Sequence, residues 1–352
     1  MNTAERIQMI GQAFTGRADL GFKSEQDLWA LVEGELGSRY ILDCPVRLGG
    51  AVFHARAPER IYHVCASNLA VSAETSLMLG LLLGSKLDFK LPSSGLPAFE
   101  KSFSLLPQPL RETVSIFHEH DIQRMAGADA VVVYGSDETI SEIRKQTGAR
   151  QRFLGYGHKI SLGVVLDRDL SQSLASKAAH EILAYEQLGC LSPQAYFCET
   201  PESAAQFARL LSDELGLLRN HDRQPLPEQS LEQAALRRNY LERTLARGEQ
   251  VLQRSQEDYM VVSGANVLET GPGHGCVQVL SGFNLIDPAR WKGRISSVSF
   301  SSEPDRSLIE QFCSLGASRF CKIGELQNPP LLWRHDGRPR LGDLVTWVTF
   351  EF

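Results

Sequence analysis

The sequence lacks the features that would separate it from ordinary globular proteins. Its longest apolar run, Leu77 to Leu83, is far shorter than the roughly 20 residues of a membrane-spanning helix, so we expect a buried helix there and no transmembrane segment. The first fourteen residues carry charge and no continuous apolar stretch, which argues against a secretory signal. There is no low-complexity tract or internal repeat, and 43% of the residues are hydrophobic, so we expect a folded chain.

Basic clusters and paired cysteines are also missing. The formal net charge is −6 with no basic block, so a nucleic-acid partner has no electrostatic support. None of the seven cysteines forms a Cys-x-x-Cys pair, which argues against a disulfide framework or a zinc site and favours reduced thiols in a cytoplasmic protein. His274 and Cys276 stand close together, but two ligands without a third do not make a metal site, and we expect no metal.

The apolar pattern alternates between strands and helices from residue 61 onward. Strands are expected within 61–68, 87–94 and 130–134, and helices at 73–85, 137–147, 170–187, 203–218 and, with a solvated charged face, 228–254. A helical region ends near Gly127, residues 1–45 are expected to form a lid or an edge, and the tail closes on a strand. This alternation predicts an α/β fold with a parallel sheet, whose ligands lie beyond the carboxyl ends of the strands.

Cys190 has the sequence surroundings of a reactive thiol. It follows a helical segment, Gly189 precedes it, and Ser192-Pro193 comes shortly after. We therefore expect a tight turn in which glycine leaves the thiol open and backbone N–H groups stabilise a thiolate. A buried cysteine that packs as a small apolar side chain is the alternative reading for any single cysteine.

Six segments, taken in order, carry a family resemblance. They are SNLAVSAETSLMLGLLLGS (67–85), KLPSS (90–94), VVVYGSDETI (131–140), FLGYGHKIS (153–161), EQLGCLSPQ (186–194) and GELQNPPLLWRHDGRP (324–339). Together they resemble the acyl-CoA reductase (LuxC-like) branch of the aldehyde dehydrogenase superfamily, from residue 45 or so to the C-terminus. The resemblance implies an N-terminal segment and Rossmann-like, parallel-sheet cofactor domain over 1–187, an α/β catalytic domain over 188–330, and an extension over 331–352 with an oligomerisation strand.

The resemblance implies roles in acyl chemistry for three residues. Cys190 falls on the nucleophile of the superfamily, and Asn68 falls on the asparagine that holds the developing oxyanion together with the backbone N–H of Cys190. A helix N-cap is the alternative role for Asn68. Gly155 stands where aldehyde-oxidising relatives carry a glutamate that activates water. Without that base we expect the acyl group to persist for reduction.

The resemblance also implies a nicotinamide cofactor. Lys90 and Ser93 fall on the turn that meets the adenosine ribose, where NAD-preferring relatives often place an acidic residue. Because lysine and serine accept a 2′-phosphate, NADPH is expected, with NADH as the other possibility. Gly135 and Ser136 match the turn that opens a helix toward the pyrophosphate.

Three further residues complete the candidates, and two of them are open to two readings. Gly157, with Gly155, belongs to the segment expected beside the cofactor, and His158 is either a proton donor to the product or a surface or cofactor-contact histidine. Glu269 faintly resembles a glutamate that binds the cofactor ribose, but its spacing is off by one residue and a turn residue is the default.

These assignments predict an enzyme that reduces a fatty acyl thioester to an aldehyde through a covalent acyl-cysteine. The acyl donor is expected to be acyl-CoA or an acylated carrier or partner protein, and the terminal strand makes a homodimer plausible. Two alternatives stay open, namely a reductase of another activated acyl group such as an acyl phosphate, and a catalytically silent acyl-binding scaffold.

Overall fold

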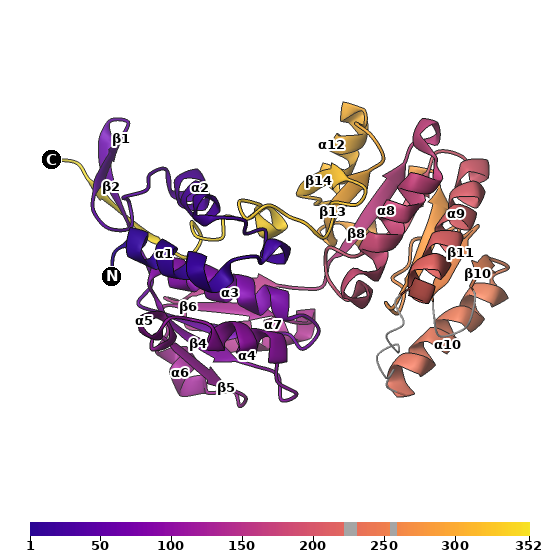
Figure 1. The fold of residues 1–352 in the computed structure, drawn as a ribbon. Helices are drawn as coiled ribbons and strands as arrows, with labels where there is room; N and C mark the ends of the chain where they lie inside the picture. The colour runs from indigo at the N-terminus through magenta and orange to yellow at the C-terminus, as the bar shows by residue number, and fades with distance from the viewer. Residues whose placement is uncertain (222–230, 254–258) are drawn as a thin grey trace. The chain divides into compact units, whose positions relative to one another are not determined.

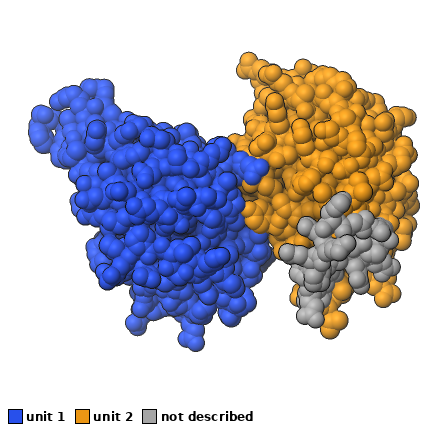
Figure 2. Space-filling model, in the orientation of Figure 1, with its two compact units in different colours: residues 1–158, 328–352 blue, residues 159–327 orange. Residues whose placement is uncertain are grey.

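The chain folds into two compact units. The structure, a computed structural model, describes residues 1–221, 231–253 and 259–352. Unit 1 comprises Met1–His158 and Asn328–Phe352, and unit 2 comprises Lys159–Gln327 (Figure 2).

The sequence predicts a boundary between cofactor and catalytic domains after residue 187, whereas the first unit of the structure gives way to the second after residue 158. Strand pairing explains this difference. Strand β8 (Ile160–Val165) pairs with β9 (Pro193–Cys198) and β13 (Ile295–Phe300), so the residues directly after 158 already belong to the second sheet. The tail returns to unit 1 because β15 (Thr346–Phe350) pairs with β2 (Ala51–Arg56).

Unit 1 is built on a five-stranded parallel sheet in the order β5-β4-β3-β6-β7 (Figure 1). Along β3, Ile61 packs into the cluster formed with the first three helices, whereas Tyr62 packs on the opposite face. Both faces are covered, as a parallel sheet requires. A second sheet has the order β1-β2-β15. The remaining strands are β1 (Val46–Leu48), β3 (Arg60–Val64), β4 (Lys86–Lys90), β5 (Val114–Phe117), β6 (Ala130–Tyr134) and β7 (Arg152–Tyr156), and the helices are α1 (Thr3–Phe14), α2 (Glu25–Leu36), α3 (Ala70–Leu83), α4 (Pro97–Ser104), α5 (Gln108–Arg111), α6 (Ile122–Ala126) and α7 (Asp137–Gln146).

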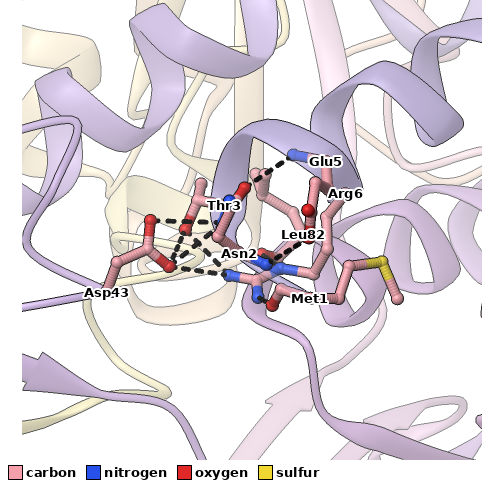
Figure 3. Close-up of polar contacts among 7 residues, drawn as sticks. All are labelled: Met1, Asn2, Thr3, Glu5, Arg6, Asp43 and Leu82. Carbon is pink, nitrogen blue, oxygen red and sulfur yellow. Dashed lines mark hydrogen bonds and ion pairs between the residues drawn. The ribbon is translucent and has the colours of Figure 1, made fainter.

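Residues 1–45 belong to the core of unit 1, contrary to the lid or edge expected from the sequence. Ile7 and Leu28, from α1 and α2, are fully buried in the same cluster as α3. The buried Arg6 side chain donates from Nε to the Leu82 carbonyl (2.9 Å) and from Nη2 to Thr3 Oγ1 (2.8 Å), and Thr3 in turn donates to Asp43 (Figure 3). These contacts fix α1 to the end of α3, because a buried guanidinium is stable only where its N–H groups have acceptors.

Unit 2 holds a seven-stranded sheet in the order β10-β11-β12-β9-β8-β13-β14, in which only the β10–β11 pairing is antiparallel. The six residues of β8 are all buried. Ile160, Leu162 and Val164 belong to one apolar cluster and Val165 belongs to another. The remaining strands are β10 (Gln250–Leu252), β11 (Met260–Ser263), β12 (Cys276–Ser281) and β14 (Arg319–Lys322), and the helices are α8 (Gln172–Leu183), α9 (Pro201–His221), α10 (Leu231–Ala246), α11 (Pro288–Trp291) and α12 (Arg306–Ser314).

Three expected elements differ from the observed ones. The helical region before Gly127 contains a strand, β5. The charged helix ends at Ala246 and is followed by β10, while residues 228–230 and 254 lie outside the described residues. The helix before Cys190 ends at Leu183, because the chain then enters a left-handed turn. Within the described ranges, no helix is long and apolar enough to cross a membrane.

Candidate active site

The expected cofactor-binding residues of unit 1 gather at one edge of its parallel sheet. Asn68 follows β3, Lys90 ends β4, Gly135 follows β6 and Gly157 follows β7. The chain runs from β3 through β4 to β5 on one side and from β6 to β7 on the other, so the direction of winding changes between β3 and β6. Ligands of open α/β sheets bind outside the carboxyl ends of the strands at such a change of direction.

Asn68 lies in the exposed turn between β3 and α3. The N-cap position of α3 belongs to Leu69, whose side chain makes no capping hydrogen bond. The structure thus assigns the N-cap of α3 to the residue next to Asn68. The position after a strand at the sheet edge is compatible with an amide that faces a ligand.

Lys90 and Ser93 provide a cation and a hydroxyl after β4. Lys90 is half-buried, its backbone oxygen accepts a hydrogen bond from the N–H of Cys65 (3.0 Å), and Ser93 lies exposed in the following turn. No acidic residue occurs in the turn 91–95 that follows this strand.

Gly135 and Ser136 lead from β6 into α7. The Ser136 hydroxyl accepts a hydrogen bond from the N–H of Thr139 (3.2 Å), so Ser136 is the N-cap of this helix. The first turn of α7 also carries Asp137 and Glu138. Two carboxylates at a helix N-terminus weaken its attraction for an anion.

The two glycines of the GYGHK segment are required by packing. A Cβ atom at Gly157 would lie 2.5 Å from Asp137 Oδ1, and a Cβ atom at Gly155 would lie 2.8 Å from a methyl group of Ile140. The same Asp137 oxygen accepts the N–H of the exposed His158 (3.3 Å). A side chain at position 155 would therefore press against Ile140 of α7.

Cys190 lies in unit 2, in the turn between α8 and β9, and its side chain is partly exposed. Three consecutive non-glycine residues before it have positive φ angles, namely Tyr185 (54°), Glu186 (53°) and Gln187 (61°). Each residue held in the left-handed region costs about 1 kcal/mol or more. Such strain persists only where other contacts impose it, and it often marks functional sites.

Glu186 supplies the first set of those contacts. Its carboxylate accepts two hydrogen bonds from the Arg219 guanidinium of α9, at 2.8 and 3.2 Å, and lies 3.6 Å from His274 Nδ1. Its backbone oxygen accepts the N–H of His274 (2.8 Å). The hydrogen bond with His274 and the Arg219 guanidinium lower the pKa of Glu186 from 4.5 to about 2. Glu186 is therefore a carboxylate at every physiological pH.

Gln187 and Ser161 supply the second set. The buried Gln187 amide donates to the backbone oxygens of Pro193 and Cys276, both at 2.8 Å. The Ser161 hydroxyl, at the start of β8, donates to the backbone oxygen of Cys190 itself (2.8 Å). The turn is thus tied to three strands of the unit 2 sheet, which limits how far the thiol of Cys190 can move.

The other cysteines are less suited to nucleophilic chemistry. Burial raises the pKa of Cys65 and Cys198 to about 12 and that of Cys276 and Cys321 to about 11. Cys44 and Cys313 are exposed, and both lie outside the six family segments. A thiol reacts as its thiolate, so the four buried or half-buried thiols are held in the inert form.

A buried carboxyl beneath the Cys190 turn was not foreseen from the sequence. Glu181 on α8 accepts hydrogen bonds from the Tyr196 hydroxyl (2.6 Å) and the N–H of Gly324 (2.7 Å), and burial raises its pKa to about 7. Gln327 bridges the backbone oxygen of Glu181 and the hydroxyl of Ser192, both at 3.1 Å. Because Glu181 stands within the apolar pattern of a helix, the sequence gives no signal that its carboxyl group is buried and hydrogen-bonded.

The weaker sequence candidates make structural contacts. Glu269 forms an ion pair with Arg247 (3.1 Å). The backbone oxygen of His274 and the sulfur of Cys276 both accept hydrogen bonds from Arg237, at 2.8 and 3.2 Å. In the part of the chain that the structure describes, no group of three or more His, Cys, Asp or Glu side chains could hold a metal ion.

Comparisons with known proteins show the family of the chain. The family model described as "Acyl-CoA reductase (LuxC)" matches residues 8–347. The chain is 27% identical to "Long-chain acyl-protein thioester reductase 2" of Photobacterium leiognathi over 183 residues, which are 49% of this chain and 38% of that protein. It therefore spans well under half of that relative. It is 25% identical to "Long-chain acyl-protein thioester reductase" of Vibrio harveyi over 347 residues, 93% of this chain and 72% of that protein.

A solved structure shows the same fold. Betaine aldehyde dehydrogenase from Staphylococcus aureus, in complex with NAD⁺, superposes with a TM-score of 0.70 at 12% identity and covers 99% of this chain and 82% of that one. The expected α/β fold of the aldehyde dehydrogenase type is thereby confirmed. With its six ordered segments and a family match along almost its whole length, the chain belongs to the acyl-CoA reductase (LuxC) family.

Proposed function

We propose that the chain reduces a fatty acyl thioester to the aldehyde with a reduced nicotinamide cofactor, through a covalent acyl group on Cys190. The observation that carries the proposal is the turn that bears this cysteine. It is partly exposed and follows three left-handed residues, whereas burial holds four other thiols in the protonated form. We propose an acyl thioester as the substrate because related proteins are named long-chain acyl-protein thioester reductases.

The proposed reaction begins with transfer of the acyl group to Cys190. The Cys190 thiolate attacks the carbonyl carbon, a new C–S bond forms, and the original thiol leaves with its electron pair and takes up a proton. The backbone N–H of Cys190 donates to the carbonyl oxygen while it is negative, and Asn68 keeps the oxyanion role that the family resemblance implies. Reduced nicotinamide, when bound, would supply a hydride to the acyl carbon. The bond from that carbon to the Cys190 sulfur then breaks, which frees the aldehyde and regenerates the thiolate. Thioester, reduced cofactor and one proton thus give aldehyde, thiol and oxidised cofactor.

Water has to be kept from the acyl-cysteine for this outcome. Gly155 occupies the place of the water-activating glutamate of aldehyde-oxidising relatives, and a side chain there would meet Ile140. The chain therefore has no general base at that position, so hydrolysis of the acyl group to the acid is slow.

Lys90 and Ser93 lead us to propose NADPH as the preferred cofactor. A lysine ammonium and a serine hydroxyl after β4 bind a 2′-phosphate, whereas an acidic residue in that turn would repel it. Gly135, Ser136, Gly155 and Gly157 complete the proposed cofactor edge through the close approach of α7 to β6 and β7. The test of this preference is a comparison of kcat/KM for the two cofactors in Lys90→Ala, which should lose efficiency mainly with NADPH.

The donor and the oligomeric state are further parts of the proposal. Related proteins are named acyl-protein thioester reductases, so the acyl group is expected to arrive as acyl-CoA or on an acylated partner or carrier protein. Strand β15 lies at the edge of the β1-β2-β15 sheet, and Trp347 on it is 43% exposed. An exposed strand edge of this kind favours pairing with a second copy of the chain.

The experiment combines a cofactor assay with mass spectrometry. Purified protein is mixed with acyl-CoA of several chain lengths and NADPH or NADH, and both cofactor oxidation and thiol release are followed. Without cofactor, the peptide that contains Cys190 should gain the mass of the acyl group. Cys190→Ala should abolish both signals, whereas Cys313→Ala, at an exposed cysteine outside the motifs, should change neither.

Each of the other outcomes of this experiment indicates a different function. Thiol release without cofactor oxidation identifies an acyltransferase or a thioesterase. Activity with acyl phosphate but with no thioester identifies the other class of activated acyl group. Acyl transfer to Cys190→Ala refutes the assignment of the nucleophile, and no reaction with any donor favours the silent scaffold.

A further inference from the structure

Unit 1 contains a small cavity lined by a buried arginine, a buried histidine and three residues with hydroxyl groups. It lies where the tail residues after 330 pack with α3 on one face of the sheet, and its volume is about 10 Å³, which accommodates about one water-sized occupant. Arg340 comes from the tail, His63 from β3 and Tyr134 from β6. The rest of the lining is Ile61, Ser76, Leu79, Gly80, Val132, Leu154, Tyr156 and Leu344.

Arg340 brings a buried positive charge to this cavity. Its side chain is 7% exposed, and Nε and Nη2 have no hydrogen-bond partner among the residues that the structure describes. The Glu35 carboxylate acts on this charge, but its oxygens accept the backbone N–H groups of Arg340 (3.0 Å) and Gly342 (3.2 Å) instead of the guanidinium. Burial lowers the pKa of Arg340, yet a guanidinium keeps its proton in proteins.

His63 adds a third donor. It is 1% exposed and stacks on Phe89 with ring centroids 4.2 Å apart. Burial lowers its pKa to about 3, so the ring is neutral. Nδ1 lies 2.9 Å from the Ser76 hydroxyl, and Nε2 has no partner among the described residues. When Ser76 donates to Nδ1, the remaining ring proton is on Nε2.

We propose that this cavity binds one small monovalent anion, chloride under ordinary conditions, through the N–H groups of Arg340 Nε and Nη2 and of His63 Nε2. A bound chloride accepts all three hydrogen bonds and neutralises the guanidinium. A water molecule has only two lone pairs for these three donors.

The anion would join the tail to the sheet of unit 1. Arg340 belongs to the segment that leads to β15, and His63 and Tyr134 lie near the carboxyl ends of β3 and β6. Binding to the folded state alone stabilises a protein in proportion to the logarithm of the ligand concentration. This site is independent of the proposed reductase activity.

The test is thermal unfolding of the full chain at constant ionic strength. Replacing sodium gluconate by sodium chloride or bromide should raise Tm in a saturable way, by roughly 2–4 °C. Arg340→Met should abolish this response and unfold in gluconate at the same or a higher temperature than the wild type, because it removes an unpaired buried charge. Arg47→Met, at an exposed position of β1, should keep the response.

A second measurement tests anion binding even if the Arg340→Met variant does not fold. Crystals of the wild-type chain grown in bromide should show an anomalous scattering peak in the cavity between Arg340 and His63. Equal Tm values in chloride and gluconate, or a water molecule in the cavity of bromide-grown crystals, would overturn the proposal. A halide response that persists unchanged in Arg340→Met would also overturn it.

Discussion

Replacing Glu186 by glutamine tests whether an ion pair holds the turn before Cys190. The substitution keeps the shape of the side chain and removes its charge, which Arg219 binds through two hydrogen bonds of 2.8 and 3.2 Å. The shift in the pKa of Glu186 from 4.5 to about 2 would correspond to roughly 3 kcal/mol at 1.36 kcal/mol per unit. Because the Glu186 side chain is 27% exposed, solvent screens the pair, and we expect a loss of about 1.5 kcal/mol.

The measurement is urea unfolding of the wild type and of Glu186→Gln at pH 7. Glu242→Gln is a matched control, because the Arg238–Glu242 pair has the same chemistry but both side chains are more than 60% exposed. Such a helical surface pair contributes only about 0.3–0.5 kcal/mol. A double-mutant cycle with Arg219→Met isolates the pair itself. Equal losses in the two glutamine variants, or no coupling in the cycle, would contradict the inference.

The same variant should also change the chemistry of Cys190. If the ion pair fixes the turn, Glu186→Gln allows the thiol more freedom, so kcat for the proposed reduction falls while KM for the acyl donor stays close to its wild-type value. The rate of alkylation of the Cys190 peptide, followed by mass spectrometry, gives a readout without cofactor. Unchanged kcat together with the expected loss of stability would show that Glu186 supports the fold but does not position the thiol.

Two further predictions concern buried carboxyl groups. The pKa of Glu181 is raised from 4.5 to about 7, so the folded state holds its proton more tightly than the unfolded state. The free energy of unfolding should therefore fall by about 3 kcal/mol as the pH rises from about 4.5 to 7. In a pH series of urea unfolding, Glu181→Gln should flatten this part of the curve, and an unchanged slope would contradict the prediction. Asp88 is fully buried and binds Arg60 (2.8 Å) and Arg124 (3.3 Å), so Asp88→Asn should cost about 2 kcal/mol in urea unfolding, and a loss below 0.5 kcal/mol would show that solvent replaces both partners.

The sequence predicts those parts of the fold in which local pattern and burial agree. The β-branched run at 130–134 forms β6, and the apolar stretch at 73–85 falls within α3 except for its last two residues. Strand β5 was missed because its four residues stand between short helices, too few to show an alternation. Residues 1–45 were misjudged because their helical pattern does not reveal which surface they pack against, and that surface is α3.

The candidate site likewise has a part that could be predicted from the sequence and a part that could not. Lys90, Ser93, Gly135 and Gly157 could be placed together from the sequence because each follows a strand of one parallel sheet, and strand ends share an edge. The surroundings of Cys190 could not be predicted. They are made by residues far away in the chain, such as Arg219 and His274, whose contacts with Glu186 leave no local pattern.

The left-handed turn shows why local propensity fails there. Glycine adopts positive φ angles at no steric cost, so glycine at 186 and 187 would relieve about 1 kcal/mol of strain at each position. It would also remove the ion pair to Arg219 and the two hydrogen bonds from Gln187 to Pro193 and Cys276, which together contribute about 3 kcal/mol. The side chains therefore outweigh the strain. The conformation before Cys190 is fixed by α9, β9 and β12, and a propensity computed from Tyr185, Glu186 and Gln187 alone has the wrong sign.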